Sequence, residues 1–201
     1  MIEHNYFGKV KKSWAGFSSE YKFNIPYFNN YKKGKEIEVF LGSELDENCE
    51  EIETAPTKDD LIEYEITLKS FLENIDNVID LIKESAFEYY KKLYAKAYEK
   101  EFPCGQYPLD DDVFEKNKNE GEMHEPLNIN DKDTHFQYMT NLNFIRIVKG
   151  GRIVLPIHYQ LDVEHKLEIL LKDNKVKEID GMSETNYWQN EDTTEQEQHE
   201  K

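Results

Sequence analysis

The densest group of side chains able to do chemistry lies between positions 158 and 165. Asp162, Glu164 and His165 stand within four residues of one another, and His158 lies shortly before them. Carboxylates and imidazole are the groups that bind a divalent metal or exchange protons near neutral pH. One interpretation is a metal-dependent or acid–base enzyme centred on Asp162, Glu164 and His165. We favour the other, a solvated polar turn between two strands, because closely spaced turn residues seldom converge on one point.

A second group consists of carboxylates alone. Ten acidic residues and a single lysine lie between Glu44 and Glu65, in a chain whose net charge is −17. A basic protein surface would complement this segment, and opposite potentials accelerate encounter. We predict that a basic partner would be met by four residues, Glu47, Glu50, Glu51 and Glu53. The alternative is that the acidity serves only solubility.

Composition excludes several classes of partner. Binding to phosphates needs clustered cations that displace counterions, so we predict neither nucleic acid nor an anionic membrane. No segment approaches the about 18 consecutive apolar residues of a membrane helix, and no secretory signal pattern is visible. Cys49 and Cys104 are isolated and form no disulfide framework. We therefore expect a cytoplasmic protein, and the excess of lysine over arginine is typical of an AT-rich bacterial genome.

Patterns typical of metal and catalytic sites are incomplete. A calcium loop that began at Asp110 would need an oxygen ligand at Phe114 and glycine at Glu115. No phosphate-binding glycine loop or nucleophile motif is present in the sequence. His135 is expected to be a partly buried, hydrogen-bonded residue of a short helix. We predict no metal and no cofactor, and a binding protein in preference to an enzyme.

The elements that would position these groups indicate an α+β fold. Residues 5–42 alternate apolar and polar side chains between turn residues, which predicts a β-meander. Residues 143–181 predict a second meander, with Gly150-Gly151 as a hairpin turn. Pro156 lacks an amide donor and predicts an edge strand or a bulge. We expect the two meanders to form one antiparallel sheet with helices packed across it.

Helical spacing dominates the region between the two meanders, from Leu61 to Ala97. Thr57 is expected as the N-cap, and the weak helix formers after residue 73 predict a break. We therefore predict two long helices, near 57–73 and 76–100.

The remaining segments are a loop, a short helix and a tail. Residues 102–130 predict a long loop, and Asp131 predicts the N-cap of a short helix. We predict a single domain over residues 1–182, followed by an acidic disordered tail over residues 183–201.

Three stretches together resemble a bacterial domain family of unknown function: residues 25–41, residues 86–90 and residues 159–169. Members of that family keep an Asp-x-Glu-His-Gly-Leu turn before a late strand. Here the turn begins at Asp162, and Lys166 stands where glycine is usual. Relatives of such domains are regarded as immunity proteins found beside polymorphic toxins. The resemblance implies neutralisation of a toxin by direct binding, and it implies no catalytic residues.

Overall fold

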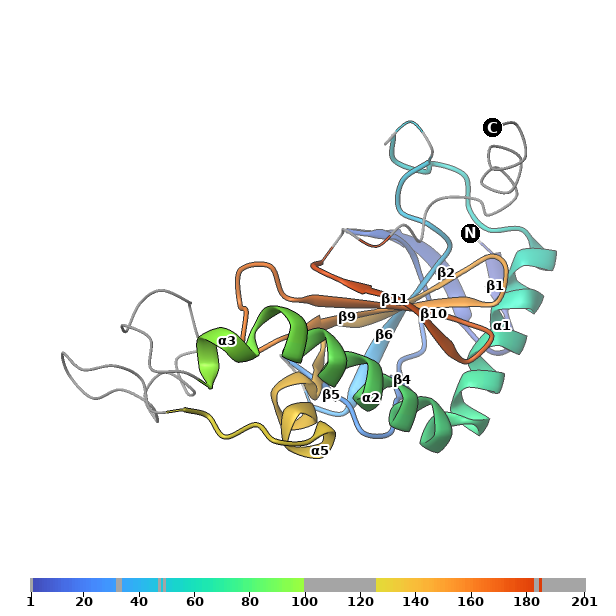
Figure 1. Cartoon of the computed structure of the whole chain (residues 1–201). Helices are drawn as coiled ribbons and strands as arrows, with labels where there is room; N and C mark the ends of the chain where they lie inside the picture. The colour runs from blue at the N-terminus through green and yellow to red at the C-terminus, as the bar shows by residue number, and fades with distance from the viewer. Residues whose placement is uncertain are drawn as a thin grey trace, which may run out of the picture.

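The computed structural model describes residues 2–31, 34–46, 48, 50–99, 126–182 and 185, and their fold is α+β (Figure 1). The elements are β1 (Ile2–His4), β2 (Gly8–Ser13), β3 (Gly16–Ser18), β4 (Phe23–Asn24), β5 (Asn29–Asn30), β6 (Glu36–Leu41), α1 (Lys58–Glu73), α2 (Ile75–Leu93), α3 (Ala95–Tyr98), α5 (Lys132–Phe136), the 3-10 helix η1 (Gln137–Met139), β7 (Asn141–Leu142), β8 (Phe144–Val148), β9 (Arg152–His158), β10 (Leu167–Lys172) and β11 (Lys175–Asp180).

The described strands form one 11-stranded sheet with the main order β1-β2-β3-β6-β8-β9-β10-β11. The predicted purely antiparallel sheet is wrong, because β6 pairs with β8 in parallel and β5 pairs with β7 in parallel. The physical reason is the connection between the two meanders. A chain that leaves β6, runs through the helices and returns to the neighbouring position makes a crossover, which joins parallel strands.

The N-terminal meander is less regular than its pattern predicted. The three residues Gly16–Ser18 form the short strand β3, and the turn before it lies at Trp14-Ala15. The stretch around residues 21–25 contributes only the two-residue strand β4. Gly16 has φ 94°, a conformation that only glycine adopts freely, and this lets β3 follow the turn directly.

The C-terminal meander has the expected hairpins. Val148 pairs with Arg152, so the hairpin loop has three residues, and two of them, Gly150 and Gly151, have φ values of 78° and 66°, in the left-handed region that favours glycine. Pro156 lies in β9, which is a central strand and not an edge. On the β8 side, β9 pairs with β7 at Ile157–Leu142 and with β8 at Val154–Arg146. Between these two pairs, the segment that runs from β7 to β8 contains one residue more than β9 does. The missing donor of Pro156 therefore lies beside an interruption of the ladder.

Helices α1 and α2 follow each other with a single residue, Asn74, between them. Thr57 and Asp60 form a capping box, in which each backbone amide donates to the other residue's side chain at 2.8 and 3.2 Å. The side-chain amide of Asn74 donates to the carbonyl oxygen of Ser70 at 2.8 Å, and such local bonds compete with helix continuation. The second helix was expected to reach residue 100; α2 ends at Leu93, and α3 follows.

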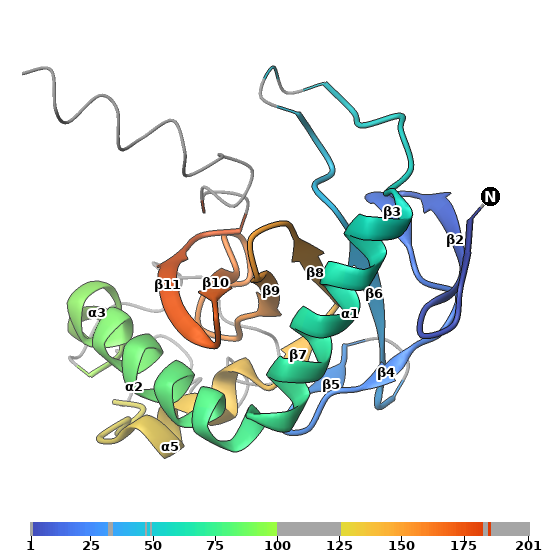
Figure 2. The same cartoon turned by 90° about the vertical axis from the view of Figure 1, so that its right-hand side faces the viewer.

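The main core lies between these helices and one face of the sheet (Figures 1 and 2). Leu61, Leu68 and Ile82 of the helices are fully buried there, against Ile145 and Ile147 of β8. Because side chains alternate along a strand, the residues between them lie on the opposite face, which we call the outer face. Phe40, Phe144 and Ala15 form a second, small cluster there.

Two predicted segments, the long loop and the acidic tail, lie largely outside the described residues. Of the predicted loop 102–130, only residues from Pro126 onward are described, and Cys49 and Cys104 both lie outside. Of the predicted tail 183–201, Thr185 alone is described; it is buried, and its hydroxyl donates to the Glu168 carboxylate of β10. None of the described helices combines the length and apolar character needed to cross a membrane.

Candidate functional site

The acidic segment after β6 folds into a hairpin that projects beyond the end of the sheet (Figure 2). We call residues 43–53 the acidic hairpin. Leu45 and Glu51 form an antiparallel bridge, and the amide of Ile52 donates to the carbonyl oxygen of Glu44 at 3.0 Å. Asp46 closes the turn, since its Oδ1 accepts from the amides of Asn48 and Glu50 at 2.8 and 3.0 Å. These backbone donors lower the pKa of Asp46.

Three of the four predicted partner-binding residues are described, and all three are exposed: Glu50, Glu51 and Glu53. Glu47 lies outside the described residues. Lys12 of β2 places its Nζ 2.5 Å from Glu53 and 3.4 Å from Glu51. The carboxylate of Glu50 has no hydrogen bond or ion pair within the described part of the chain. One lysine therefore compensates part of the charge, and the hairpin remains negative.

A buried arginine fixes the base of the acidic hairpin. The side chain of Arg146 is only 2% exposed and lies on the outer face. It donates to the carbonyl oxygens of Gly42 and Ala15 at 3.0 and 2.9 Å and to Glu44 Oε2 at 3.2 Å. The guanidinium carbon also lies 5.2 Å from the ring centre of Phe40. A single cation thus joins the β2–β3 turn, the end of β6 and the first acidic residue of the hairpin.

Trp14 lies beside this base, and the sequence patterns did not single it out. It occupies the β2–β3 turn and is 68% exposed. Its ring meets Phe40 and Phe144 edge-on, with ring centres 5.3 and 5.4 Å apart. The only signal in the sequence is a large aromatic residue between two polar strand ends, which does not reveal whether the ring is buried or open.

At the predicted polar site, the structure brings Asp162 and His165 together. The amide of His165 donates to Asp162 Oδ1 at 2.9 Å, and its Nδ1 lies 3.1 Å from both carboxylate oxygens. The hydroxyl of Tyr94 donates to Asp162 Oδ2 at 2.8 Å, and that of Tyr98 donates to the carbonyl oxygen of Leu161 at 2.5 Å. Asp162 therefore caps its own turn, and the two tyrosines join this turn to α3 and to the residue between α2 and α3.

The other two members of the predicted site lie apart from this pair. The carboxylate of Glu164 is exposed and makes no hydrogen bond or ion pair among the described residues. His158 is 8% exposed on β9, and its ring stacks on Tyr31 with centres 3.8 Å apart. Within the described ranges, no three residues among His, Cys, Asp and Glu are grouped so that they could hold a metal ion. Among the four predicted residues, only Asp162 and His165 lie close enough for the carboxylate and the imidazole to polarise one another.

Lys166, in the turn that begins at Asp162, has φ 59°. This left-handed conformation favours glycine, which explains why a turn of this kind would carry one. The amide of Lys166 still donates to the carbonyl oxygen of Asp162 at 2.8 Å, so the turn closes with lysine in place. Lysine at this position therefore costs conformational strain, while the turn itself is kept.

A buried group of tyrosines surrounds His135, which was expected to be a hydrogen-bonded residue of a short helix. His135 is fully buried on α5, and its Nε2 lies 2.8 Å from the hydroxyl oxygen of Tyr159. Burial lowers the pKa of His135 to about 4 and raises that of Tyr159. Its Nδ1 has no hydrogen-bond partner among the described residues. The imidazole is therefore neutral and is held by packing and one hydrogen bond.

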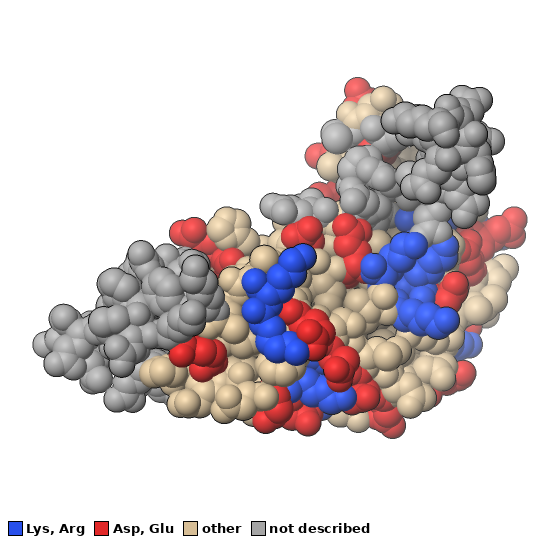
Figure 3. All heavy atoms as spheres, in the orientation of Figure 1, with Lys and Arg blue, Asp and Glu red and all other residues tan. Residues whose placement is uncertain are grey.

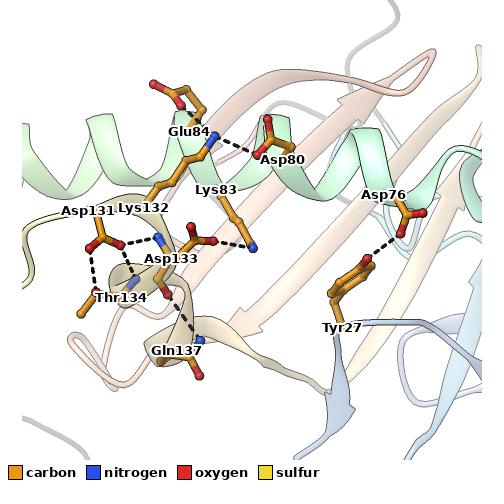
Figure 4. A network of polar contacts seen from close by, with 10 residues as sticks. All are labelled: Tyr27, Asp76, Asp80, Lys83, Glu84, Asp131, Lys132, Asp133, Thr134 and Gln137. Atoms are coloured by element: carbon orange, nitrogen blue, oxygen red, sulfur yellow. Dashed lines mark hydrogen bonds and ion pairs between the residues drawn. The ribbon is translucent and has the colours of Figure 1, made fainter.

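A charge ladder joins α5 to α2 across the same region (Figure 4). Lys132 places its Nζ 2.8 Å from Asp80 and 3.2 Å from Glu84, and Lys83 lies 2.6 Å from Asp133. On the face seen in Figure 3, basic and acidic side chains are interleaved over these helices. Here the carboxylates are matched by lysines of the same chain.

Comparison of the chain with protein-family models, with curated proteins and with solved structures found no match.

Proposed function

We propose that this protein acts by binding a basic protein through the acidic hairpin, as an immunity protein that neutralises a toxin domain. The observation that carries the proposal is the hairpin itself. It projects from the sheet, its carboxylates at Glu50, Glu51 and Glu53 are exposed, and the one lysine that pairs with Glu51 and Glu53 compensates only part of their charge. The fixed base at Arg146 holds these charges in a defined place.

In this mechanism the hairpin carboxylates meet lysine and arginine side chains of the toxin and cover its substrate groove. Opposite potentials raise the rate of encounter. Each exposed ion pair contributes only about 0–1 kcal/mol. Charge alone therefore gives rate and orientation, and an aromatic contact beside the hairpin must supply the remaining affinity.

The test is co-purification of the full chain with the products of the neighbouring genes over a series of salt concentrations. A basic partner should be retained at low ionic strength and released as salt screens the contact. The combined substitution Glu50→Lys, Glu51→Lys and Glu53→Lys should abolish retention.

The matched control changes the net charge equally but elsewhere, by Glu3→Lys, Glu73→Lys and Glu164→Lys, which are all exposed. This control variant should keep most of the partner. Failure to retain any basic partner at low ionic strength would overturn the proposal. Equal retention by wild type and hairpin variant would favour a domain whose acidity serves only solubility.

One observation favours a second function, acid–base catalysis at the β9–β10 turn. The side chain of His165 is 69% exposed, while its Nδ1 is 3.1 Å from the largely buried Asp162. A carboxylate that orients an imidazole is the arrangement of a general base. Any hydrolytic activity of the protein should then be lost in His165→Gln but kept in Glu164→Gln. An activity that both variants retain would remove this alternative.

A further inference from the structure

Trp14 combines exposure with a fixed orientation. The side chain is 68% exposed, yet its edge contacts place it against Phe40 and Phe144, which are themselves buried. Aromatic rings that meet edge-on restrain one another. The indole is therefore supported from below, and much of its surface is open to solvent without further rearrangement of the chain. Large, pre-oriented aromatic side chains of this kind are typical anchors of protein interfaces.

Residues on both sides of Trp14 along the chain contact the acidic hairpin or its base. Two residues before it, Lys12 pairs with Glu51 and Glu53. Directly after it, the carbonyl oxygen of Ala15 accepts from Arg146, which also binds Glu44. The indole thus lies at the root of the most acidic part of the described chain.

Glu44 is linked to the turn that carries Trp14 through Arg146, which donates both to Glu44 and to the carbonyl oxygen of Ala15. Its side chain is 37% exposed, and its Oε2 is 3.2 Å from Arg146. Its Oε1 has no partner among the described residues. Arg146 is 2% exposed, so its charge stays beneath the surface. The surface beside Trp14 therefore presents an aromatic ring and an open carboxylate oxygen.

An exposed indole next to carboxylates fits a cation. The ring attracts positive charge through its quadrupole, and tryptophan is the best of the aromatic side chains in this respect. A guanidinium suits the place better than an ammonium, because it is planar, stacks on rings and donates to a carboxylate while stacked. We infer that Trp14 and Glu44 form the docking point for an arginine side chain of the basic partner. This inference rests on the proposed function and adds the residue type that the partner inserts.

The test uses the full chain with Trp188→Phe, so that Trp14 is the single tryptophan. A short arginine homopeptide and a lysine homopeptide of equal length serve as probes at low ionic strength. The arginine peptide should bind more tightly and should change the fluorescence of Trp14. By calorimetry, Trp14→Ala should weaken binding of the arginine peptide about tenfold and that of the lysine peptide much less.

Two further variants keep this test decisive. Trp14→Phe keeps an aromatic ring over Phe40 and Phe144, so it should fold normally and give an intermediate affinity. Leu81→Ala removes a side chain that is 45% exposed on α2, a helix that packs against β11 at the opposite end of the sheet order from β2 and β3, and should leave binding unchanged.

The outcomes separate the two proposals. If the arginine peptide binds and is lost in the Glu50, Glu51 and Glu53 variant, but Trp14→Ala binds as wild type does, the inference about Trp14 is overturned and the proposed function stands. If neither peptide binds at low ionic strength, the proposed function fails and the inference fails with it. Equal affinity for the two peptides also overturns the choice of arginine.

Discussion

The acidic hairpin and the helical side of the molecule, meaning α2, α3, α5 and the β9–β10 turn, are both rich in carboxylates, but these carboxylates have different partners. On the helical side Asp80 and Glu84 pair with Lys132, and Asp162 accepts from Tyr94. Glu99 accepts from the hydroxyl of Tyr90 and from two backbone amides. At the hairpin, Lys12 and Arg146 are the cations that approach the carboxylates among the described residues.

This difference teaches that net charge alone does not locate a binding surface. On the helical side the acidic residues stabilise the fold, because lysines and tyrosines of the same chain meet them. At the hairpin, the carboxylates outnumber the cations that pair with them among the described residues. The charge that remains without a partner, and not the charge that is present, is what a second protein can use.

The largest expected effect breaks the base of the hairpin. Arg146→Ala removes three hydrogen bonds and leaves two backbone carbonyls without a donor in a buried place. The free energy of unfolding should fall by about 2–6 kcal/mol, because each buried carbonyl left without a donor costs about 1–3 kcal/mol. Urea unfolding measures it. Arg146→Lys keeps the charge but not the fork of donors and should lose an intermediate amount; a loss below about 1 kcal/mol for alanine would contradict this role.

The second effect concerns pH on the helical side. The pKa of His135 is about 4 in the folded protein and 6.5 in its ordinary state. As pH falls between these values, the unfolded chain binds a proton that the folded chain does not. The free energy of unfolding should therefore decrease by up to about 3 kcal/mol on this account. Above the ordinary pKa this contribution is absent.

Urea unfolding at several pH values, compared with His135→Gln, measures the contribution of His135. The wild-type protein should lose stability more steeply toward low pH than this variant. Identical pH profiles of wild type and His135→Gln would contradict the burial argument.

A smaller effect tests the β9–β10 turn. Lys166 has φ 59°, a conformation that costs a non-glycine residue about 1–2 kcal/mol. Lys166→Gly should raise the free energy of unfolding by about 1 kcal/mol, after the entropy of glycine is deducted. Lys175→Gly, on β11, should instead destabilise the protein. A loss of stability in both variants would show that the lysine side chain matters more than the backbone.

The smallest effects compare two lysines that form ion pairs, Lys132 and Lys12. Lys132→Ala removes the two ion pairs with Asp80 and Glu84 and should lower the melting temperature slightly at low salt, with no difference at high salt. Lys12→Ala frees Glu51 and Glu53 and should tighten binding of the arginine homopeptide. If Lys132→Ala bound the arginine homopeptide more tightly than the wild type and Lys12→Ala did not, the comparison between the two regions would be reversed.

Local patterns predicted the parts of the fold that depend on neighbouring residues. The capping box at Thr57, the break at Asn74 and the glycine hairpin at Gly150 each need only a few residues to form. The parallel pairing of β6 with β8 could not be predicted in this way, because the two strands are joined through the whole helical region. Pairing of that kind depends on how the helices fold back on the sheet.

The same distinction between local patterns and contacts of distant segments applies to the candidate site. The acidic segment is visible in the sequence because it is continuous. The exposure of Trp14 depends on Phe40 and Phe144, which are distant in the chain, and the burial of Arg146 depends on three separate segments. The spacing of Asp162, Glu164 and His165 suggested a shared site, but the turn directs Asp162 inward to Tyr94 and leaves Glu164 in solvent.

The most direct test of the central claim compares two variants of equal net charge. One carries Glu50→Lys, Glu51→Lys and Glu53→Lys, and the other carries Glu3→Lys, Glu73→Lys and Glu164→Lys. The dissociation constant for the arginine homopeptide is measured for both across a range of ionic strengths. The account predicts that the hairpin variant loses at least about tenfold more affinity than the other, with a weaker salt dependence. Equal losses in the two variants would show that the hairpin has no special role.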